Sequence, residues 1–258
     1  MKMYLNNLWK YKDLFVELVK KDIKLKYRNS VLGIIWSLLN PLLMTAVLSI
    51  VFMALFKNNI EHFPLYVMSG RILYQFFADS TNFAMNSIHA NGQLIRKVYV
   101  PKYFFPLSRV CSSFITTLIS MVTLIILMPI EGVPFRWMNL LFVIPLFYLF
   151  VISAGIGLLL ASINVFFRDL QHMYSIVLMI IMYMTPIFYP ASIIPQKYQH
   201  LLQLNPLHPI MEMFRDVVTY GTIPTLTLHY VPIFYMFLTG ILGLFVFYKT
   251  QDRFIHYL

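Results

Sequence analysis

Five polar side chains in one apolar segment form the pattern in this chain that is best suited to binding or chemistry. Arg71, Gln75, Asp79, Asn82 and Asn86 recur at i, i+4, i+8, i+11 and i+15, which places them along one side of a helix. An Arg or Asp held in lipid at mid-bilayer costs about 2.5–3.5 kcal/mol by insertion scales. These side chains must therefore face a cavity, water or a partner helix. Two interpretations stay open: a hydrophilic lining for a polar substrate, or hydrogen bonding between helices with Arg71 near the headgroups.

Aromatic side chains near this stripe give a second, weaker pattern. Aromatic residues make up 17% of the chain, and most of them suit the belts that aromatic side chains form at membrane interfaces. Six could also stack on sugar rings: Tyr74, Phe76, Phe77, Tyr183, Phe188 and Tyr189. This pattern alone does not decide between a substrate path and an interfacial belt.

The motifs of common catalytic sites do not occur in the sequence. It holds no G-x-x-x-x-G-K-[ST] loop for nucleotide phosphates and no H-E-x-x-H pair. The seven histidines are scattered without ligand spacing, and no Ser or Cys lies in a recognisable nucleophile context. Cys111 is the only cysteine, which leaves no disulfide framework and no metal cluster. We therefore expect a chain that is not an enzyme and binds no metal or cofactor itself.

Composition places the chain in a membrane. Of its 258 residues, 59% are hydrophobic and 12% are charged, whereas soluble domains carry about 25% charged residues. The formal charge is +10, but the basic residues lie at the edges of apolar segments, where the positive-inside rule explains them better than nucleic-acid binding does. We expect a single, all-helical transmembrane domain over 1–258, without a separate soluble domain.

Hydrophobic stretches divide the chain into six expected membrane spans. Crossing a bilayer takes about 20 mainly apolar residues. The segments that meet or approach this length are 31–56, 64–88, 105–128, 140–163, 173–189 and 230–248. Pro41 lies in the middle of the first, and it predicts a kink because proline removes one backbone hydrogen bond.

Counting Lys and Arg decides whether the polar second segment crosses. With six spans and the N-terminus inside, 15 of these residues fall on the cytoplasmic side and four fall outside. If the second segment did not cross, every later connection would change sides and the split would be 11 against eight. Because cytoplasmic connections carry the excess of positive charge, the sequence favours six spans with both termini in the cytoplasm.

Three connections stand out from simple loops. Segment 1–30 has aromatics and Lys residues at helical spacing, which is typical of an amphipathic helix in the membrane surface. Segment 91–104 is basic and belongs to the short stretch that separates the second and third spans. Segment 191–227 is too apolar for a hydrated linker, and we interpret it as two short helices that dip into the outer leaflet, where protein or water must cover irregular backbone.

Two smaller motifs have purely structural interpretations when taken alone. Phe167-Arg168-Asp169 lies in a very short cytoplasmic connection and suits a helix cap with a positive-inside arginine. Ser153, Gly157 and Ala161 form a small-xxx-small face for close packing between helices.

Together the motifs resemble the membrane subunit of bacterial ABC exporters for cell-surface polysaccharides, of the O-antigen and teichoic-acid type. The resemblance covers nearly the whole chain. It rests on the order and spacing of KYRNSVLGIIWSLLNPLL, LIRKVYVPKYFFPLSRV, NVFFRDLQH, TPIFYP and LNPLHPIMEMFRDVVTYG.

The resemblance implies roles for particular residues. A coupling helix that docks on a separate ATPase would contain Leu94, Ile95, Arg96, Lys97, Val98 and Tyr99. Phe167, Arg168 and Asp169 would mark a second turn near that interface. Outer gate helices would contain Ile194, Tyr198, Leu201, Asn205, Pro206, Met211 and Arg215. Arg71 and Gln75 depart from the family pattern, in which less polar residues are common, and the tail after Lys249 has no assigned contact.

The resemblance also implies an assembly. Two copies of this chain would enclose a channel in the bacterial plasma membrane, with two ATPase subunits that carry ATP and Mg beneath them. The substrate would be a lipid-linked polysaccharide.

Rival interpretations remain at this level. The same scaffold could export another lipid or a drug. An ion-coupled secondary transporter would need protonatable groups near mid-membrane, and Asp79 is the only acid within an expected span. A membrane-embedded enzyme acting on lipid-linked sugars would need an acid–base or nucleophile set that the motifs do not supply.

Overall fold

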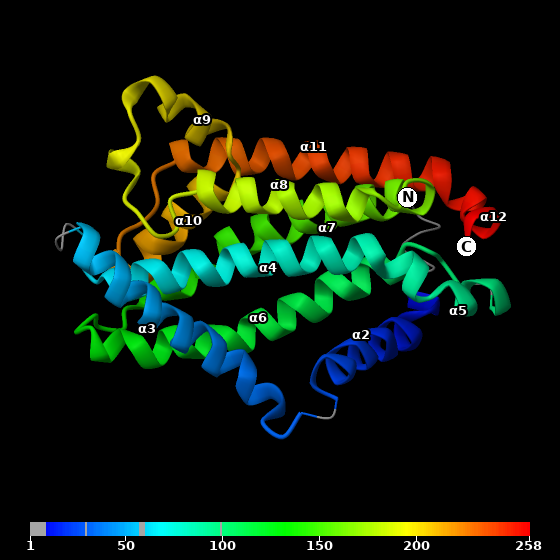
Figure 1. Ribbon diagram of the computed structural model, residues 1–258, viewed down its shortest axis with the longest axis horizontal. Coiled ribbons are helices and arrows are strands. Elements are labelled where there is room, and N and C mark those ends of the chain that lie inside the picture. Colours follow the sequence, from blue (N-terminus) through cyan, green and yellow to red (C-terminus); the bar gives the residue numbers. More distant parts are fainter. Residues whose placement is uncertain (1–8, 29, 57–59, 99) are drawn as a thin grey trace.

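The regular structure is helical throughout the part of the chain that is described, and long helices run along one axis (Figure 1). A computed structural model describes residues 9–28, 30–56, 60–98 and 100–258. The longer helices are α2 (Lys12–Tyr27), α3 (Trp36–Phe56), α4 (Phe63–Ala90), α6 (Phe104–Ile130), α7 (Val143–Phe166), α8 (Leu170–Met184) and α11 (Thr227–Thr250). The shorter pieces are η1 (Gly33–Ile35), α5 (Gly92–Lys97), η2 (Trp137–Phe142), η3 (Ala191–Ile193), η4 (Gln196–Tyr198), α9 (Gln199–Leu204), α10 (Leu207–Arg215), η5 (Asp216–Tyr220), η6 (Gln251–Arg253) and α12 (Phe254–Tyr257).

Four helical stretches are long and apolar enough to cross a membrane by themselves. They are Gly33–Met53, Phe104–Ile130, Trp137–Phe166 and Thr227–Tyr257. Two other helices each meet one of the two criteria. Helix α4 is long enough, with 28 residues, but carries the polar stripe; helix α8 is apolar but has only 15 residues. The protein is therefore a multi-pass, all-helical membrane protein.

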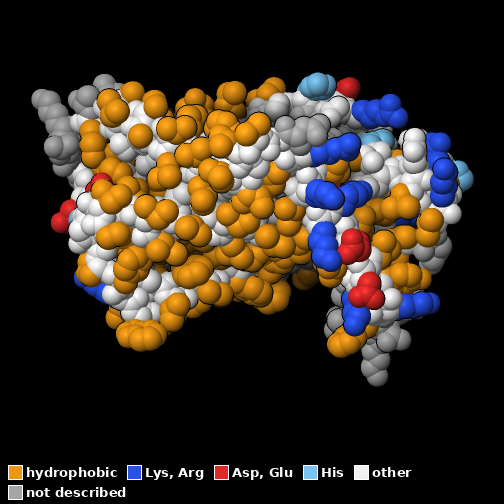
Figure 2. All heavy atoms as spheres, turned by 90° about the horizontal axis from the view of Figure 1, so that it is seen from below, with side chains coloured by type: hydrophobic (Ala, Val, Ile, Leu, Met, Phe, Trp, Pro, Cys, Tyr) orange, Lys and Arg blue, Asp and Glu red, His pale blue; other side chains and the backbone are white. Residues whose placement is uncertain are grey.

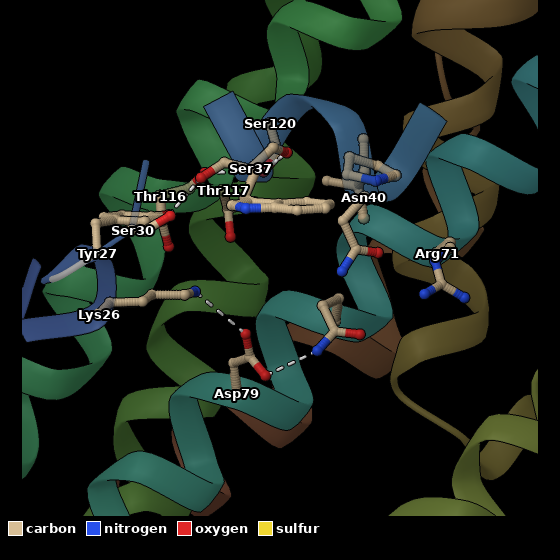
Figure 3. Close-up of a pocket in the computed structure, with 14 residues that line it drawn as sticks. Lys26, Tyr27, Ser30, Ser37, Asn40, Arg71, Asp79, Thr116, Thr117 and Ser120 are labelled. Atoms are coloured by element: carbon tan, nitrogen blue, oxygen red, sulfur yellow. Dashed lines mark hydrogen bonds and ion pairs between the residues drawn. The ribbon is translucent and has the colours of Figure 1, made fainter. Parts of the chain in front are cut away.

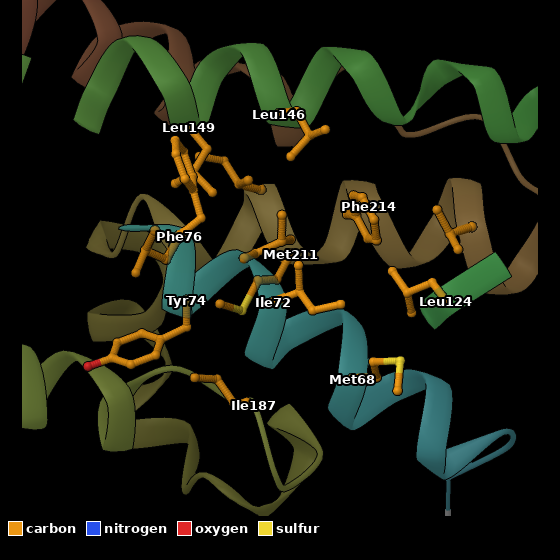
Figure 4. Packing of buried hydrophobic residues seen from close by; sticks show 14 of the residues in the cluster. Met68, Ile72, Tyr74, Phe76, Leu124, Leu146, Leu149, Ile187, Met211 and Phe214 are labelled. Atoms are coloured by element: carbon orange, nitrogen blue, oxygen red, sulfur yellow. The ribbon is translucent and has the colours of Figure 1, made fainter. Parts of the chain in front are cut away.

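Helix α4 forms the centre of the bundle. It packs against α3, α6 and α7, and most of its apolar side chains are buried, with Phe83 as an exposed exception. Figure 4 shows Met68, Ile72 and Phe76 of α4 facing Leu146 and Leu149 of α7 across the core. The polar stripe predicted on this segment therefore lies on a helix whose other faces are held by neighbours on several sides.

Helices α7 and α11 approach each other closely at two glycines. A methyl group on Gly155 would lie 2.5 Å from the carbonyl carbon of Thr239, and a methyl group on Gly243 would overlap the carbonyl oxygen of Gly155. On the other side of α7, Gly157 faces Ala84 of α4, where an added methyl carbon would lie 2.8 Å away. Small residues allow this approach because helices in lipid associate through van der Waals packing.

A second apolar cluster joins the elements at one end of the bundle. Phe254 of α12 is 0% exposed and contacts the ring of Phe247 of α11. Ile95 of α5 and Phe104 of α6 belong to the same cluster. The C-terminal tail, for which the sequence suggested no contact, therefore supports the short helix α5. Lys102 adds a polar link, since its Nζ donates to the carbonyl oxygen of Gln251 at 2.6 Å.

The amphipathic helix α2 is tied to this end by a buried acid. Asp22 is 6% exposed. Its Oδ1 lies 3.3 Å from Arg109 Nη1, and its Oδ2 accepts a hydrogen bond from Ser108 Oγ at 3.3 Å. Burial raises the pKa of Asp22 above its ordinary value, although Arg109 and Lys21 act in the opposite direction. Figure 2 shows Lys and Arg side chains gathered toward the end with α2, α5 and α12, beside a broad apolar band.

The chain between α8 and α11 is irregular. Helix α8 ends at Met184, five residues before the predicted end of the fifth span, because a residue before proline is driven out of the helical region and Thr185 is extended ahead of Pro186. The pieces η3, η4, α9, α10 and η5 follow within 191–220. The two helices predicted in this region correspond to α9 and to α10 with η5.

Candidate functional site

A polar cavity of about 370 Å³ lies between α2, α3, α4 and α6 (Figure 3). Its wall contains three members of the predicted stripe, Arg71, Gln75 and Asp79. Opposite them lie Lys26, Tyr27, Ser30, Trp36, Ser37, Asn40, Pro41, Thr116, Thr117 and Ser120, and Ile72 adds an apolar contact on α4. Polar groups from four elements thus meet beside a largely apolar bundle.

The α3 wall owes its polarity to a proline. Proline at position 41 has no N–H, so the carbonyl of Ser37, four residues earlier, has no intrahelical partner. Ser120 Oγ of α6 donates to that carbonyl at 3.0 Å, and the hydroxyls of Ser37 and Tyr27 are also hydrogen-bonded to each other. A helix break in lipid requires such replacement partners. Asn40, beside the proline, is exposed and points into the cavity (Figure 3).

The α4 wall carries the charges. Gln75 Nε2 donates to Asp79 Oδ1 at 2.8 Å, and Lys26 Nζ of α2 lies 3.6 Å from Asp79 Oδ2. Arg71 lies one helical turn before Gln75 on α4 and forms no ion pair with the described residues. The carboxylate is thus compensated by a helix that the sequence placed at the membrane surface, while the Arg71 guanidinium has its donors available.

The α6 wall consists of hydroxyl groups. Thr116, Thr117 and Ser120 line the cavity, and they continue a series of Ser and Thr that begins at Ser112 and recurs at helical spacing. Sequence reasoning on the third span overlooked this series, although its period was a usable signal. It also overlooked Lys26 and Trp36, which reach the cavity only because α2 and α3 meet beside α4.

The chemistry of the wall suits a hydroxyl-rich ligand. Amides, hydroxyls, one compensated carboxylate and the Arg71 guanidinium offer both donors and acceptors, and Trp36 supplies a flat apolar surface. A few convergent polar groups on apolar walls are typical of ligand pockets. No group of three or more potential metal ligands occurs among the described residues.

The remaining two members of the stripe lie beyond the cavity: Asn82 is exposed, and Asn86 contacts α7. Asn86 Oδ1 accepts a hydrogen bond from Asn164 Nδ2 at 3.4 Å, while Asn86 Nδ2 donates to the carbonyl of Asn82 at 3.1 Å. The stripe is therefore divided: its first three members line a cavity, and its last member, Asn86, links α4 to α7.

The six predicted stacking aromatics lie outside the wall of the polar cavity, and two of them, Phe76 and Phe77, are buried in the core. The hydroxyl of Tyr74 donates to a carbonyl of α8 at 2.8 Å. The hydroxyl of Tyr189 donates to the carbonyl of Tyr183 at 2.6 Å, and Phe188 is buried with its ring stacked on Phe52. Five of the six therefore make contacts within the protein, while Tyr183 exposes 63% of its surface.

The predicted coupling segment folds as α5, a short helix with two distinct sides. Ile95 is buried and Leu94 is half-buried against the end cluster. Three side chains are exposed: Arg96, Lys97 and Val98. Tyr99 lies outside the described residues.

The turn between α7 and α8 lies at the same end of the molecule. Phe167 is 68% exposed, and Arg168 and Asp169 are also exposed. Asp169 precedes α8, but its carboxylate makes no capping hydrogen bond. The preceding Phe166 contacts the ring of Phe254, so α5 and this turn are supported by one cluster.

The predicted gate residues divide between core and surface. Asn205 Nδ2 donates to Thr185 Oγ1 at 2.8 Å, and Pro206 follows as the N-cap of α10. Met211 is 1% exposed and Arg215 is 4% exposed, so α10 is part of the core (Figure 4).

The η3–η4 side of this region is more open. Tyr198 is 49% exposed, and Ile194 is half-buried. The side chain of Leu201 lies outside the described residues.

An apolar helical bundle with a polar cavity and a basic, partly exposed helix at one end has the features of a membrane transport protein. Comparison with known proteins defines the class further. The chain belongs to the ABC-2 type transporter family, whose family model matches residues 13–219. This confirms the family resemblance inferred from the motifs.

Individual relatives match along nearly the whole chain. The O-antigen export system permease protein RfbA of Klebsiella pneumoniae is 31% identical over 94% of this chain and 93% of its own length. RfbA of Myxococcus xanthus is 30% identical over 81% of this chain and 82% of its own. The polysialic acid transport protein KpsM of Escherichia coli is 27% identical over 90% of this chain and 91% of its own.

Proposed function

We propose that this chain is the permease subunit of an ATP-driven exporter that moves a lipid-linked cell-surface polysaccharide across the bacterial plasma membrane. The observation that carries the proposal is the polar cavity formed by α2, α3, α4 and α6 in a chain of this family. Its amides, hydroxyls and Trp36 suit a sugar better than they suit an apolar drug or a lipid tail. The names of the relatives, which are polysaccharide and O-antigen exporters, support the same substrate class.

The proposed topology has six spans, with α4 and α8 added to the four apolar helices. Helix α4 can cross because its charged groups face the cavity and α2 rather than lipid. With 15 residues, α8 has a length of about 22 Å, and the extended segment after Met184 would complete the crossing. The concentration of Lys and Arg at the α2–α5–α12 end supports a cytoplasmic location for that end (Figure 2).

The proposed partner is a separate ATPase that binds ATP and Mg. Arg96, Lys97 and Val98 project from α5 while Ile95 anchors it. Exposed cations and an apolar side chain on a rigidly supported helix form a surface that a soluble subunit can bind. Phe167, with Arg168 and Asp169, extends that surface. The complex would contain two copies of this chain and two ATPase subunits.

The cavity would bind sugar units as they pass. The Lys26–Asp79 pair is half-exposed, so either group can exchange its partner for a sugar hydroxyl without being stranded in lipid. Arg71 is placed to donate hydrogen bonds further along α4. Hydrogen bonds that can be replaced one by one favour passage over tight capture.

The test is ATP-dependent export by the purified complex in vesicles. Wild-type permease with its ATPase should move lipid-linked polysaccharide, whereas Gln75→Ala and Asn40→Ala should slow export without abolishing assembly. Asn82→Ala is the matched control, since this amide lies on α4 outside the cavity. Export by the permease without an ATPase subunit, or dependence on a proton gradient instead of ATP, would refute the proposal.

A further inference from the structure

One buried cation joins three elements at the α10 end of the bundle. Arg215, the last residue of α10, is 4% exposed. Its Nη2 donates to the carbonyl oxygens of Tyr66, at 3.2 Å, and Pro186, at 3.1 Å. The guanidinium also stacks on the ring of Tyr66, with 3.5 Å between its central carbon and the ring centroid. Helix α10, the start of α4 and the chain leaving α8 therefore meet at one side chain.

This charge is held without an ion pair among the described residues. A buried charge is costly unless it is paired or well hydrogen-bonded. Here two carbonyls and an aromatic face stabilise the cation together. Nε of Arg215 has no hydrogen-bond partner in the described structure. Such an arrangement is sensitive to position, because a small displacement removes both carbonyl bonds at once.

The neighbouring residues are shaped to admit the guanidinium. Gly70 provides the space, since a methyl group there would lie 2.7 Å from Arg215 Nη2. The Tyr66 hydroxyl lies 3.1 Å from the carbonyl oxygen of Pro186 and 3.0 Å from that of Tyr189. Tyr66 thus binds the segment after α8 with its hydroxyl while it supports the cation with its ring.

A cavity beside Arg215 and Tyr66 offers the charge a second location. This cavity of about 510 Å³ is lined by Glu61, Glu212 and Asp216 together with Arg215. None of these carboxylates is within ion-pair distance of the guanidinium in the described structure. The cation can therefore leave the carbonyls of Tyr66 and Pro186 for carboxylates instead of lipid.

We propose that Arg215 is the latch that holds α10 and the segment after α8 against α4, and that export requires this latch to open. In the closed position the guanidinium bonds to Tyr66 and Pro186. In the open position it turns toward the acidic cavity and frees the segment after α8. The role as a gate rests on the proposed function, whereas the latch itself rests on the contacts.

Passive leakage tests the latch directly. The permease–ATPase complex is reconstituted without nucleotide in vesicles that contain a small self-quenched dye, and dye release is measured per correctly folded complex. Arg215→Gln should leak about tenfold faster than wild type, which corresponds to a shift of about 1.4 kcal/mol in the closed–open equilibrium. Arg215→Lys should leak at an intermediate rate, because it keeps the charge but loses the planar stack.

Arg136→Gln is the matched control. Arg136 Nη1 also donates to a backbone carbonyl, that of Tyr220, at 2.7 Å, but this side chain is exposed. The variant should therefore leak no faster than wild type. A residue with a merely structural role would lower the folded fraction without raising leakage per folded complex.

Tyr66→Phe covers the case in which Arg215→Gln does not fold. It keeps the ring under the guanidinium and removes only the hydroxyl that binds the segment after α8, so leakage should rise less than in Arg215→Gln but remain above wild type. Wild-type leakage in a folded Arg215→Gln or, failing that, in a folded Tyr66→Phe overturns the latch. Failure of wild-type ATP-dependent export overturns the proposed function and leaves the leakage result to decide the latch separately.

Discussion

The crossing of α7 and α11 allows a sharp test of how this bundle is held together. At Gly155 an added methyl carbon would lie 2.5 Å from the carbonyl carbon of Thr239 and 2.8 Å from the backbone nitrogen of Gly240. Gly240 belongs to the same crossing, yet a methyl group there meets nothing within 4 Å. Gly155→Ala and Gly240→Ala therefore make the same chemical change, one against backbone and one into open space.

The expected magnitudes follow from this geometry. Alanine stabilises a helix interior by about 1 kcal/mol relative to glycine, so Gly240→Ala should be neutral or stabilising by up to that amount. For Gly155→Ala, ordinary contact begins at 3.4 Å, so the overlap at 2.5 Å requires a retreat of nearly an ångström. A gap of that size forfeits about a quarter to a half of the local dispersion attraction, and overpacking costs about 1–3 kcal/mol. Gly155→Ala should thus be less stable than Gly240→Ala by about 2 kcal/mol or more.

The assay is equilibrium unfolding of the purified protein in lipid bicelles, followed by circular dichroism or steric trapping. Gly243→Ala should behave like Gly155→Ala, since its methyl group would overlap the Gly155 carbonyl oxygen. The double variant should lose less than the sum of the single losses, because both changes act on one contact. A Gly155→Ala protein as stable as Gly240→Ala would refute the view that close backbone contact stabilises this crossing.

Three further changes test other parts of the fold. Ser120→Ala should lower the free energy of unfolding by about 1–3 kcal/mol, because it strands the α3 carbonyl freed by proline, whereas Ser175→Ala, which removes an exposed bond within α8, should change it little; the same unfolding assay measures both. Phe254→Ala should cost about 3–5 kcal/mol, and pull-down should show weaker ATPase binding because α5 loses its support. Burial raises the pKa of Asp22, so folding favours its protonated form, and wild type should lose stability relative to Asp22→Asn as pH rises from about 4 through the raised pKa. If wild type instead gained stability relative to Asp22→Asn as pH rises, the attraction to Arg109 would outweigh the effect of burial.

The sequence predicted the parts of the fold that depend on local pattern. The spacing from Arg71 to Asp79 was sufficient to place three polar groups on one face of α4, and Thr185-Pro186 contains the signal that ends α8. Pro41 identifies the carbonyl that needs a new partner, because the missing bond always falls four residues earlier. It cannot identify Ser120 as the donor, since that depends on how α3 crosses α6.

Long-range contacts account for what the sequence left open. Lys26 reaches Asp79 only because α2 packs against α6, which also packs against α4, and nothing local to α2 encodes that placement. Phe254 is buried because the tail folds over the end cluster. The division of the stripe between cavity and helix contact depends on Asn164, which is 78 residues from Asn86 along the chain. Such pairings depend on how the helices pack, which local sequence patterns do not determine.

Helix α4 connects the three functional features in one rigid element. Its 28 residues span about 42 Å, with Tyr66 at the latch, Asp79 in the cavity and Asn91 at its C-cap. Asn91 is also the N-cap of α5, and its Oδ1 accepts a hydrogen bond from Lys21 Nζ of α2 at 2.8 Å. A displacement of α5 by a bound ATPase therefore acts on the end of α4 directly. Because α4 contains no proline beyond its first turn to absorb that displacement, the motion must reappear along the helix, at the cavity and at the carbonyl that holds Arg215.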